Sequence, residues 1–236
     1  DFTVNQEAAT LWFHPHALGT TAEQVYAGLA GLIFVEDDNS DQLDLPKDYG
    51  VNDFPLIIQD RSFDADNQFD YAGAYDPDGT YGDTLLVNGT INPFVEVKNE
   101  QIRLRLVNGS NARNYTFGLE NGAEFHQIAS DGGFLEQPVA LTSVTLTPGE
   151  RAEIIVDLSG YAEGDTVKLM DGNATVLSLN VTEEADAQTA LPQTLNEIPE
   201  LVTDGAAVQR FTLSGMSFMV NINGSQFDMD RIDVEQ

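Results

Sequence analysis

The stretch PFVEVKNEQIRLRLVNGS, residues 93–110, decides the fold class. Two sets of side chains alternate within it, and this two-residue period predicts a β-strand with one face buried. The first set is Arg103, Arg105 and Val107, and the second is Ile102, Leu104 and Leu106. The run ends in Asn-Gly, which is typical of a tight turn.

The same pattern recurs along the chain. Runs of β-branched and aromatic residues, such as 32–37 and 54–63, are separated by Asn-Gly, Asp-Gly and other turn signals. Helical periodicity is scarce, and only one short helix is predicted within 20–28, with Thr20 or Thr21 as its N-cap. Many short strands at this spacing predict an all-β fold, a Greek-key sandwich or barrel.

Two polar segments, residues 39–53 and 184–208, divide the chain. Both contain proline and lack strand periodicity, as expected of connectors. We therefore expect five parts: the end of a first domain at 1–38, a connector at 39–53, a complete second domain at 54–183, a linker at 184–208 and the start of a third domain at 209–236. The first and last parts are too short to fold alone, so we expect the chain to be the middle of a larger protein.

Composition excludes several classes of function. The 236 residues include 39 acidic and 10 basic side chains and no cysteine, for a net charge of −29. Such a charge repels phosphate backbones and anionic lipid surfaces, so we expect neither nucleic-acid binding nor membrane insertion. The lack of cysteine excludes disulfides and any thiolate-bound metal in this chain. An ordinary secreted protein and a protein adapted to high salt both remain compatible with the acidity.

His14 and His16 are the candidate metal ligands. They flank Pro15 in LWFHPHALGT, residues 11–20, and neutral imidazole binds copper, zinc, iron or nickel. Residues two apart in an extended strand project from one face, roughly 6–7 Å apart, which suits two imidazoles that each reach a different metal. Pro15 lacks a backbone donor and predicts an edge or irregular position in the strand. A His-x-His pair also occurs often by chance, so the spacing alone leaves a structural role open.

The sequence around this pair resembles a known family. TLWFHPHALGTTAEQVYAGLAGLIFVEDD, residues 10–38, resembles a signature of multicopper oxidases, the family of laccases, bilirubin oxidases and cuprous oxidases. The resemblance continues in order through LPKDYGVNDFPLIIQD (45–60), LTPGERAEIIVDL (146–158) and MVNINGSQFDMDRID (219–233). The resemblance covers nearly the whole chain. Within the family, the chain resembles the bacterial three-domain group, whose domains are cupredoxin-like.

The resemblance implies a site and a reaction. It assigns His14 and His16 to the type 3 copper pair of a trinuclear cluster, one imidazole on each copper. It implies a full-length enzyme that couples one-electron oxidation of phenols, pigments or metal ions to four-electron reduction of dioxygen to water. The type 1 copper site and the remaining copper motifs would lie outside this chain, so we expect the segment alone to be inactive and to need the rest of its own polypeptide. It also implies export to the periplasm, cell surface or exterior.

Two expectations accompany this interpretation. Trp12 and Phe13 are expected to pack around the site, and His126 to have a structural or surface role on a second-domain strand. The alternative function is a copper-free cupredoxin-like scaffold, as in division-associated relatives of the family. Retention of both imidazoles beside Pro15 favours the oxidase, because a scaffold has no need of them.

Overall fold

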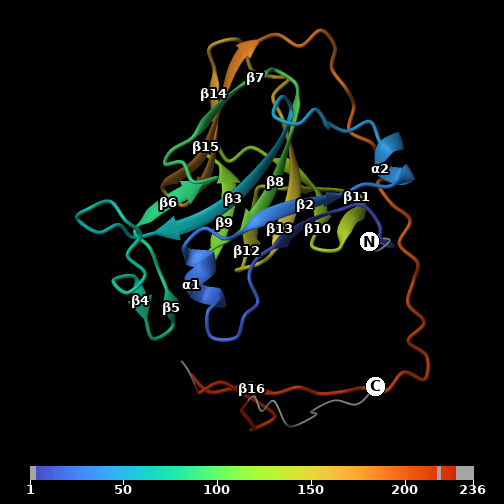
Figure 1. Cartoon of the computed structure of the whole chain (residues 1–236). Helices are drawn as coiled ribbons and strands as arrows, with labels where there is room; N and C mark the ends of the chain where they lie inside the picture. Colours follow the sequence, from blue (N-terminus) through green and yellow to red (C-terminus); the bar gives the residue numbers. More distant parts are fainter. Residues whose placement is uncertain (1–3, 217–218, 227–236) are drawn as a thin grey trace.

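The strand prediction can be compared with a computed structural model that describes residues 4–216 and 219–226. Part of the predicted third-domain segment, 217–218 and 227–236, therefore lies outside the described residues. Two sheets form the body of the molecule (Figure 1). Their strands are dominated by the β-branched and aromatic runs that the sequence analysis identified.

The six-stranded sheet has the order β11-β10-β13-β8-β3-β6. Its strands are β3 (Asp53–Arg61), β6 (Thr84–Val87), β8 (Gln101–Asn108), β10 (Phe125–Ser130), β11 (Gly133–Leu141) and β13 (Arg151–Asp157). Neighbours are antiparallel except that β3 and β8 run parallel. β8 lies at a central position in this sheet, which explains the regular two-residue alternation of residues 101–108.

The five-stranded sheet has the order β12-β9-β14-β15-β7. Its strands are β7 (Phe94–Lys98), β9 (Tyr115–Leu119), β12 (Ser143–Leu146), β14 (Thr166–Asp171) and β15 (Ala174–Glu183). The inner faces of the two sheets enclose one apolar core, in which Leu104, Phe117, Ile154 and Leu169 have no exposed surface. Burial of this surface is the main stabilising contribution. The predicted all-β sandwich is confirmed.

A separate two-stranded ribbon lies on the outer side of the six-stranded sheet (Figure 1). It consists of β1 (Ala9–Phe13) and β2 (Gly31–Val35), antiparallel and joined through α1 (Thr21–Tyr26). The predicted helix is confirmed, and Thr20 is its N-cap residue, but no side-chain capping hydrogen bond forms. The hydroxyls of Thr20 and Thr21 donate to the Ala17 carbonyl instead of accepting from the first helical N–H groups.

A second helix, α2 (Asp38–Gln42), occupies the predicted connector, where no helix was expected. The Asp37 side chain accepts from Ser40 N, and the Ser40 hydroxyl accepts from Asp37 N, which forms a capping box. Five residues are too few for an apolar periodicity, so only the cap residues signalled this helix.

The prediction that β8 buries one face was wrong, because both faces are buried. Arg103 and Arg105 are 6% and 5% exposed, similar to the apolar residues that alternate with them. The ribbon and α2 cover the arginine face, and acidic side chains compensate its charge. A buried cation is tolerated only with such partners.

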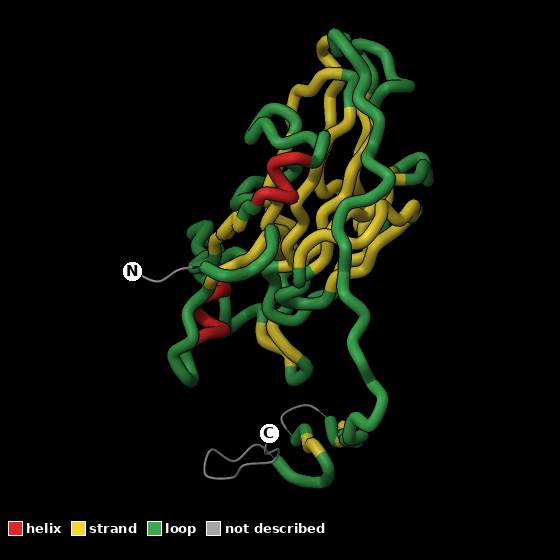
Figure 2. The backbone as a smooth tube through the Cα atoms, turned by 90° about the vertical axis from the view of Figure 1, so that its right-hand side faces the viewer, coloured by secondary structure: helices red, strands yellow, loops and turns green. Residues whose placement is uncertain are grey.

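After β15 the chain runs without helix or strand until β16 (Leu213–Ser214), which pairs with β17 (Asn221–Ile222). Part of this segment lies along the sandwich before the chain leaves it (Figure 2). Leu195 is 1% exposed there, and its backbone bonds to Glu136 and to the Asn39 side chain. The domain boundaries stay predictions. None of the helices in the described ranges has the length and apolarity to cross a membrane.

A further short hairpin, β4 (Tyr75–Asp76) and β5 (Gly79–Thr80), projects beyond β3 near α1 (Figure 1). Tyr26 of α1 packs against aromatic rings of this region, including Phe69 and Tyr71. Its hydroxyl also accepts from Ser62 N at 2.7 Å. These contacts hold α1 against the end of the six-stranded sheet, which places His14 beside the loops that follow β8 and β12.

Candidate metal centre

The two candidate ligands lie side by side directly after β1. The ring centroids of His14 and His16 are 4.3 Å apart with an interplanar angle of 33°. Trp12 continues the row, with its centroid 4.3 Å from that of His14. Residues 12, 14 and 16 therefore stack on one side of the chain, as alternate residues of an extended segment do. His14 is half-buried and His16 is exposed.

One nitrogen of His14 has a defined role. Its Nδ1 lies 3.0 Å from the carbonyl oxygen of Pro15, which can only accept. Nδ1 therefore carries the proton of the neutral ring, and the lone pair of Nε2 is available to a metal. The neighbouring proline is accommodated as expected, since β1 ends at Phe13 and pairs with β2 alone in a two-stranded sheet.

A cavity of about 330 Å³ and one of about 300 Å³ flank β1. The smaller one lies beside His14 and is mainly apolar. Its walls come from β1 and the residue after it, from α1 and from two loops of the sandwich: Trp12, His14, Thr21, Ala22, Val25, Ser110, Asn111, Pro148 and Gly149. The loops after β8 and β12 thus reach the candidate ligands, a contact that no motif in the sequence indicated.

Trp12 packs as expected, and Phe13 differs. Trp12 lies against His14 at an interplanar angle of 37° and lies beside Gly149, where an added Cβ would be 3.4 Å from the indole. Phe13 points the other way, is 56% exposed and covers Gly31 of the paired strand. Only Trp12 belongs to the immediate surroundings of the imidazoles.

The described residues supply two imidazoles and no third ligand. No group of three or more histidine, aspartate or glutamate side chains that could hold a metal ion occurs within 4–216 and 219–226. His126 lies in β10 and lines a different cavity, of about 380 Å³, together with Gln101 and Asp157. Its predicted structural or surface role stays a prediction.

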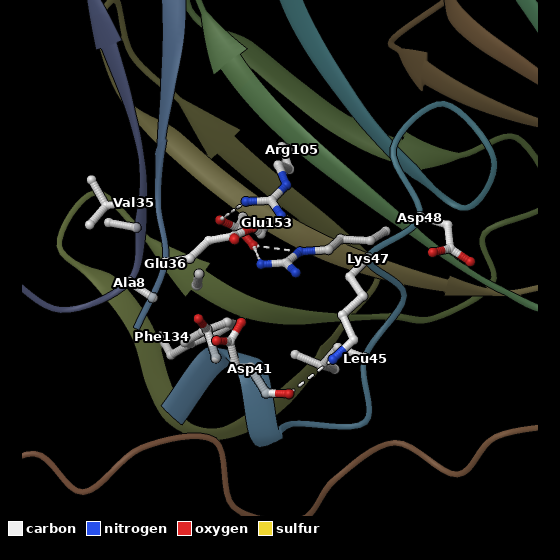
Figure 3. Close-up of a pocket in the computed structure, with 14 residues that line it drawn as sticks. Ala8, Val35, Glu36, Asp41, Leu45, Lys47, Asp48, Arg105, Phe134 and Glu153 are labelled. Atoms are coloured by element: carbon white, nitrogen blue, oxygen red, sulfur yellow. Dashed lines mark hydrogen bonds and ion pairs between the residues drawn. The ribbon is translucent and has the colours of Figure 1, made fainter. Parts of the chain in front are cut away.

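A buried charged layer lies between the ribbon and the six-stranded sheet (Figure 3). We use this name for Arg103, Arg105, Glu153 and Asp53 together with Thr10 of β1. Arg103 Nε donates to Glu153 Oε2 at 2.8 Å, and Arg105 forms a two-pronged pair with Asp53 through Nε at 2.8 Å and Nη2 at 2.6 Å. Both pairs form charge-assisted hydrogen bonds.

Electrostatics keep Glu153 ionised within this layer. Burial by itself would raise the pKa of Glu153, but Arg103, Arg105 and the Thr10 hydroxyl together hold that pKa below its ordinary value. The guanidinium of Arg105 also lies 4.5 Å from the centroid of Phe34 on β2. No sequence motif predicts this layer; its only signal in the sequence is two basic residues spaced two apart in a strongly predicted strand.

Comparisons with known proteins agree with this architecture. Two family models, both described as multicopper oxidase, match residues 1–40 and 52–166. The multicopper oxidase mco of Staphylococcus haemolyticus is 44% identical over 236 residues, which is 100% of this chain and 49% of that protein. The cell division protein FtsP of Xenorhabdus nematophila is 40% identical over 98% of this chain and 52% of its own length.

Solved structures give the same result. The multi-copper oxidase from Pediococcus acidilactici superposes with a TM-score of 0.94 at 43% identity, over 100% of this chain and 50% of that one. The McoA multicopper oxidase from Aquifex aeolicus has a TM-score of 0.87 at 39% identity, over 95% of this chain and 52% of its own. The chain spans about half the length of the curated relatives it matches. It belongs to the multicopper oxidase family.

Proposed function

We propose that the full-length protein is a multicopper oxidase that couples one-electron oxidation of phenolic, pigment or metal-ion substrates to four-electron reduction of dioxygen to water. The observation that carries this proposal is the pairing of His14 and His16, whose rings stack 4.3 Å apart beside an apolar cavity. Family membership and relatives that bear the name multicopper oxidase support it.

Within this proposal His14 and His16 each bind one copper of the type 3 pair. The residues present fit such ions, because neutral imidazole is a good copper ligand and the proton on His14 Nδ1 leaves Nε2 available. The other ligands, and the type 1 site, would come from parts of the polypeptide outside this chain. This segment alone is therefore expected to be inactive.

The residues of this chain contribute orientation and a dry environment. The bound coppers would supply the electrons for dioxygen reduction. Pro15 holds the His14 ring in one tautomer through its carbonyl, and Trp12 packs against the ring face. The apolar wall of the neighbouring cavity limits water at His14, which strengthens electrostatic interactions and restricts side reactions.

The test is made on the purified full-length protein. Copper content, the visible absorption of the type 1 copper and the oxygen consumed per electron are measured for the wild type and His14→Ala. The variant is expected to lose oxygen reduction and copper from the pair, while the type 1 colour persists. His126→Ala, which removes an imidazole on another strand, is the matched control and should keep full activity. Undiminished turnover in His14→Ala would refute the assignment.

A second candidate is a copper-free scaffold or interaction protein. The 40% identity to a cell division protein over 98% of this chain favours it as the alternative. Retention of both imidazoles argues for the oxidase. A full-length protein that stays colourless and copper-free after incubation with copper salts would establish the scaffold instead.

The proposal also includes partners and location. The proposed partners are dioxygen, a small reducing substrate and the remainder of the polypeptide. The proposed location is the periplasm, the cell surface or the exterior, after export. The net charge of −29 supports the absence of nucleic-acid binding.

A further inference from the structure

We propose that Thr10, held by Arg105 and Glu153, is a positioning residue for the His14–His16 pair. The second domain would thereby set the geometry of a site to which it contributes no metal ligand. This inference rests on the proposed function, since it concerns the orientation of the proposed copper ligands.

Thr10 links the ribbon to the charged layer through its side chain. The Thr10 hydroxyl donates to Glu153 Oε1 at 2.6 Å and accepts from Arg105 Nη1 at 2.9 Å. Thr10 is 2% exposed and Glu153 is also 2% exposed, so these bonds lie in a buried environment, where hydrogen bonds are stronger than in water. One hydroxyl is thus fixed by an anion and a cation, each of which is held in turn by a partner on the six-stranded sheet.

The backbone of Thr10 is held as well. Arg151 Nε donates to the Thr10 carbonyl at 3.3 Å, and the same guanidinium is fixed by the Asp131 carbonyl at 2.9 Å and the Gly149 carbonyl at 3.1 Å. Two positions earlier, Ala8 N donates to Asp37 Oδ2 at 2.9 Å. The start of β1 is therefore anchored to the six-stranded sheet through Arg151 and to the end of its own ribbon through Asp37.

The anchor and the ligands lie on the same side of the chain. Residues 10, 12, 14 and 16 are alternate positions, and the contacts run in sequence from Thr10 in the charged layer to Trp12 on Gly149, then to His14 and His16. Gly149 adopts a φ of +87°, so the loop that receives Trp12 requires glycine. A shift or twist of β1 at Thr10 would move the imidazoles relative to the loops that face them.

β1 has little else to fix this register. It pairs only with β2, and a two-stranded ribbon is marginal by itself. Trp12 makes a packing contact, which tolerates sliding better than a directional, charge-assisted hydrogen bond does. The Thr10 hydroxyl is therefore the side-chain group of β1 that adds a directional anchor to these backbone contacts.

The experiment compares Thr10→Val with Thr10→Ser in the full-length protein. Valine preserves the shape of threonine and removes the hydroxyl, whereas serine retains the hydroxyl. Amide hydrogen exchange within residues 11–16, all of which except Pro15 have a backbone N–H, is measured on the copper-free protein. The copper-to-protein ratio and the fraction of copper visible by electron paramagnetic resonance are measured after reconstitution, because a magnetically coupled cupric pair is silent.

Thr10→Val is expected to raise exchange at residues 11–16 about tenfold, as loss of a buried charge-assisted bond implies. It should also make part of the paired copper visible by resonance or lower the copper ratio. Thr10→Ser should match the wild type in each measurement. If Thr10→Val does not fold, Thr10→Ala, which leaves room for a bridging water, replaces it with the same expected direction.

Unchanged exchange and unchanged resonance in a folded hydroxyl-free variant would overturn the inference. Raised exchange with an intact coupled pair would overturn it too, because β1 would then be anchored without controlling the ligands. A wild-type protein without a silent copper pair would instead refute the proposed function, and the exchange data on copper-free protein would still report on the anchor.

Discussion

The two faces of β8 differ in chemistry, yet both are buried. One face, with Ile102, Leu104 and Leu106, lies in the apolar core between the sheets. The other, with Arg103 and Arg105, lies in the charged layer beneath the ribbon. Burial alone therefore does not tell which face holds the sandwich together and which attaches another part of the chain.

The apolar face of β8 contributes mainly stability, whereas the charged face contributes a specific position for the ribbon. Apolar packing is non-directional, and many arrangements of leucine and isoleucine fill a sandwich core. Paired guanidinium and carboxylate groups accept only a few geometries, so they fix where the ribbon sits. The strand that leads into the candidate copper ligands, β1, is attached through the directional face.

Glu153→Ala should have the largest effect on stability. It leaves the buried Arg103 without a carboxylate, and breaking a buried pair in this way costs about 3–5 kcal/mol. Urea unfolding of the full-length protein measures the cost. Glu120→Ala is the matched control, because Glu120 pairs with Lys168 at 3.2 Å on the surface, where loss of a pair costs about 0–1 kcal/mol. Equal effects of the two variants would contradict a distinct role for the charged layer.

Leu104→Ala tests the apolar face of β8. Leu104 is fully buried in the sandwich core, and its truncation should cost about 2–5 kcal/mol in the free energy of unfolding. Hydrogen exchange under native conditions should rise across both sheets without a preferential rise at residues 11–16. A selective loosening of the ribbon in this variant would show that the two faces are not independent.

Acid should weaken the charged layer by a smaller amount. Burial opposes ionisation of Glu153, but the neighbouring arginines and the Thr10 hydroxyl outweigh it, so its pKa in the folded protein lies below that of the unfolded chain. The stabilisation from this carboxylate is therefore complete above the ordinary glutamate pKa, about 4.3, and is lost as the pH falls through the folded value.

Glu153→Gln isolates this contribution from that of the other acidic residues. Its unfolding free energy should decline less steeply than that of the wild type as the pH is lowered below about 4.3. The comparison uses urea midpoints at a series of pH values. Parallel declines in the two proteins would mean that Glu153 is not held ionised by its partners.

The sequence predicted the strands better than their surroundings. The run at 54–63 became β3 (Asp53–Arg61), and 20–28 contained α1, because β-branched runs and flanking turn residues act locally. Arg103 and Arg105 were assigned to an exposed face, because alternation reports polarity and not what covers it. Their carboxylate partners, Asp53 and Glu153, are about 50 residues away in the chain.

The candidate site, like the fold, was predictable from the sequence only in part. His14 and His16 were identified from their spacing and from the resemblance of residues 10–38 to a family signature. Their ring stacking, the proton position on His14 and the contact of Trp12 with Gly149 were not predictable from spacing. These features depend on loops that approach from the second domain.

By itself the sequence determined the all-β class, the short helix and the identity of two imidazoles beside a proline, since each depends on neighbours within a few residues. Tertiary structure alone decided that a strand of alternating charge is buried on both sides and that Thr10 meets Glu153, 143 residues further on. The physical reason is that a buried ion needs partners with exact complementary charge and direction, and the chain can supply them only after the sheets have formed.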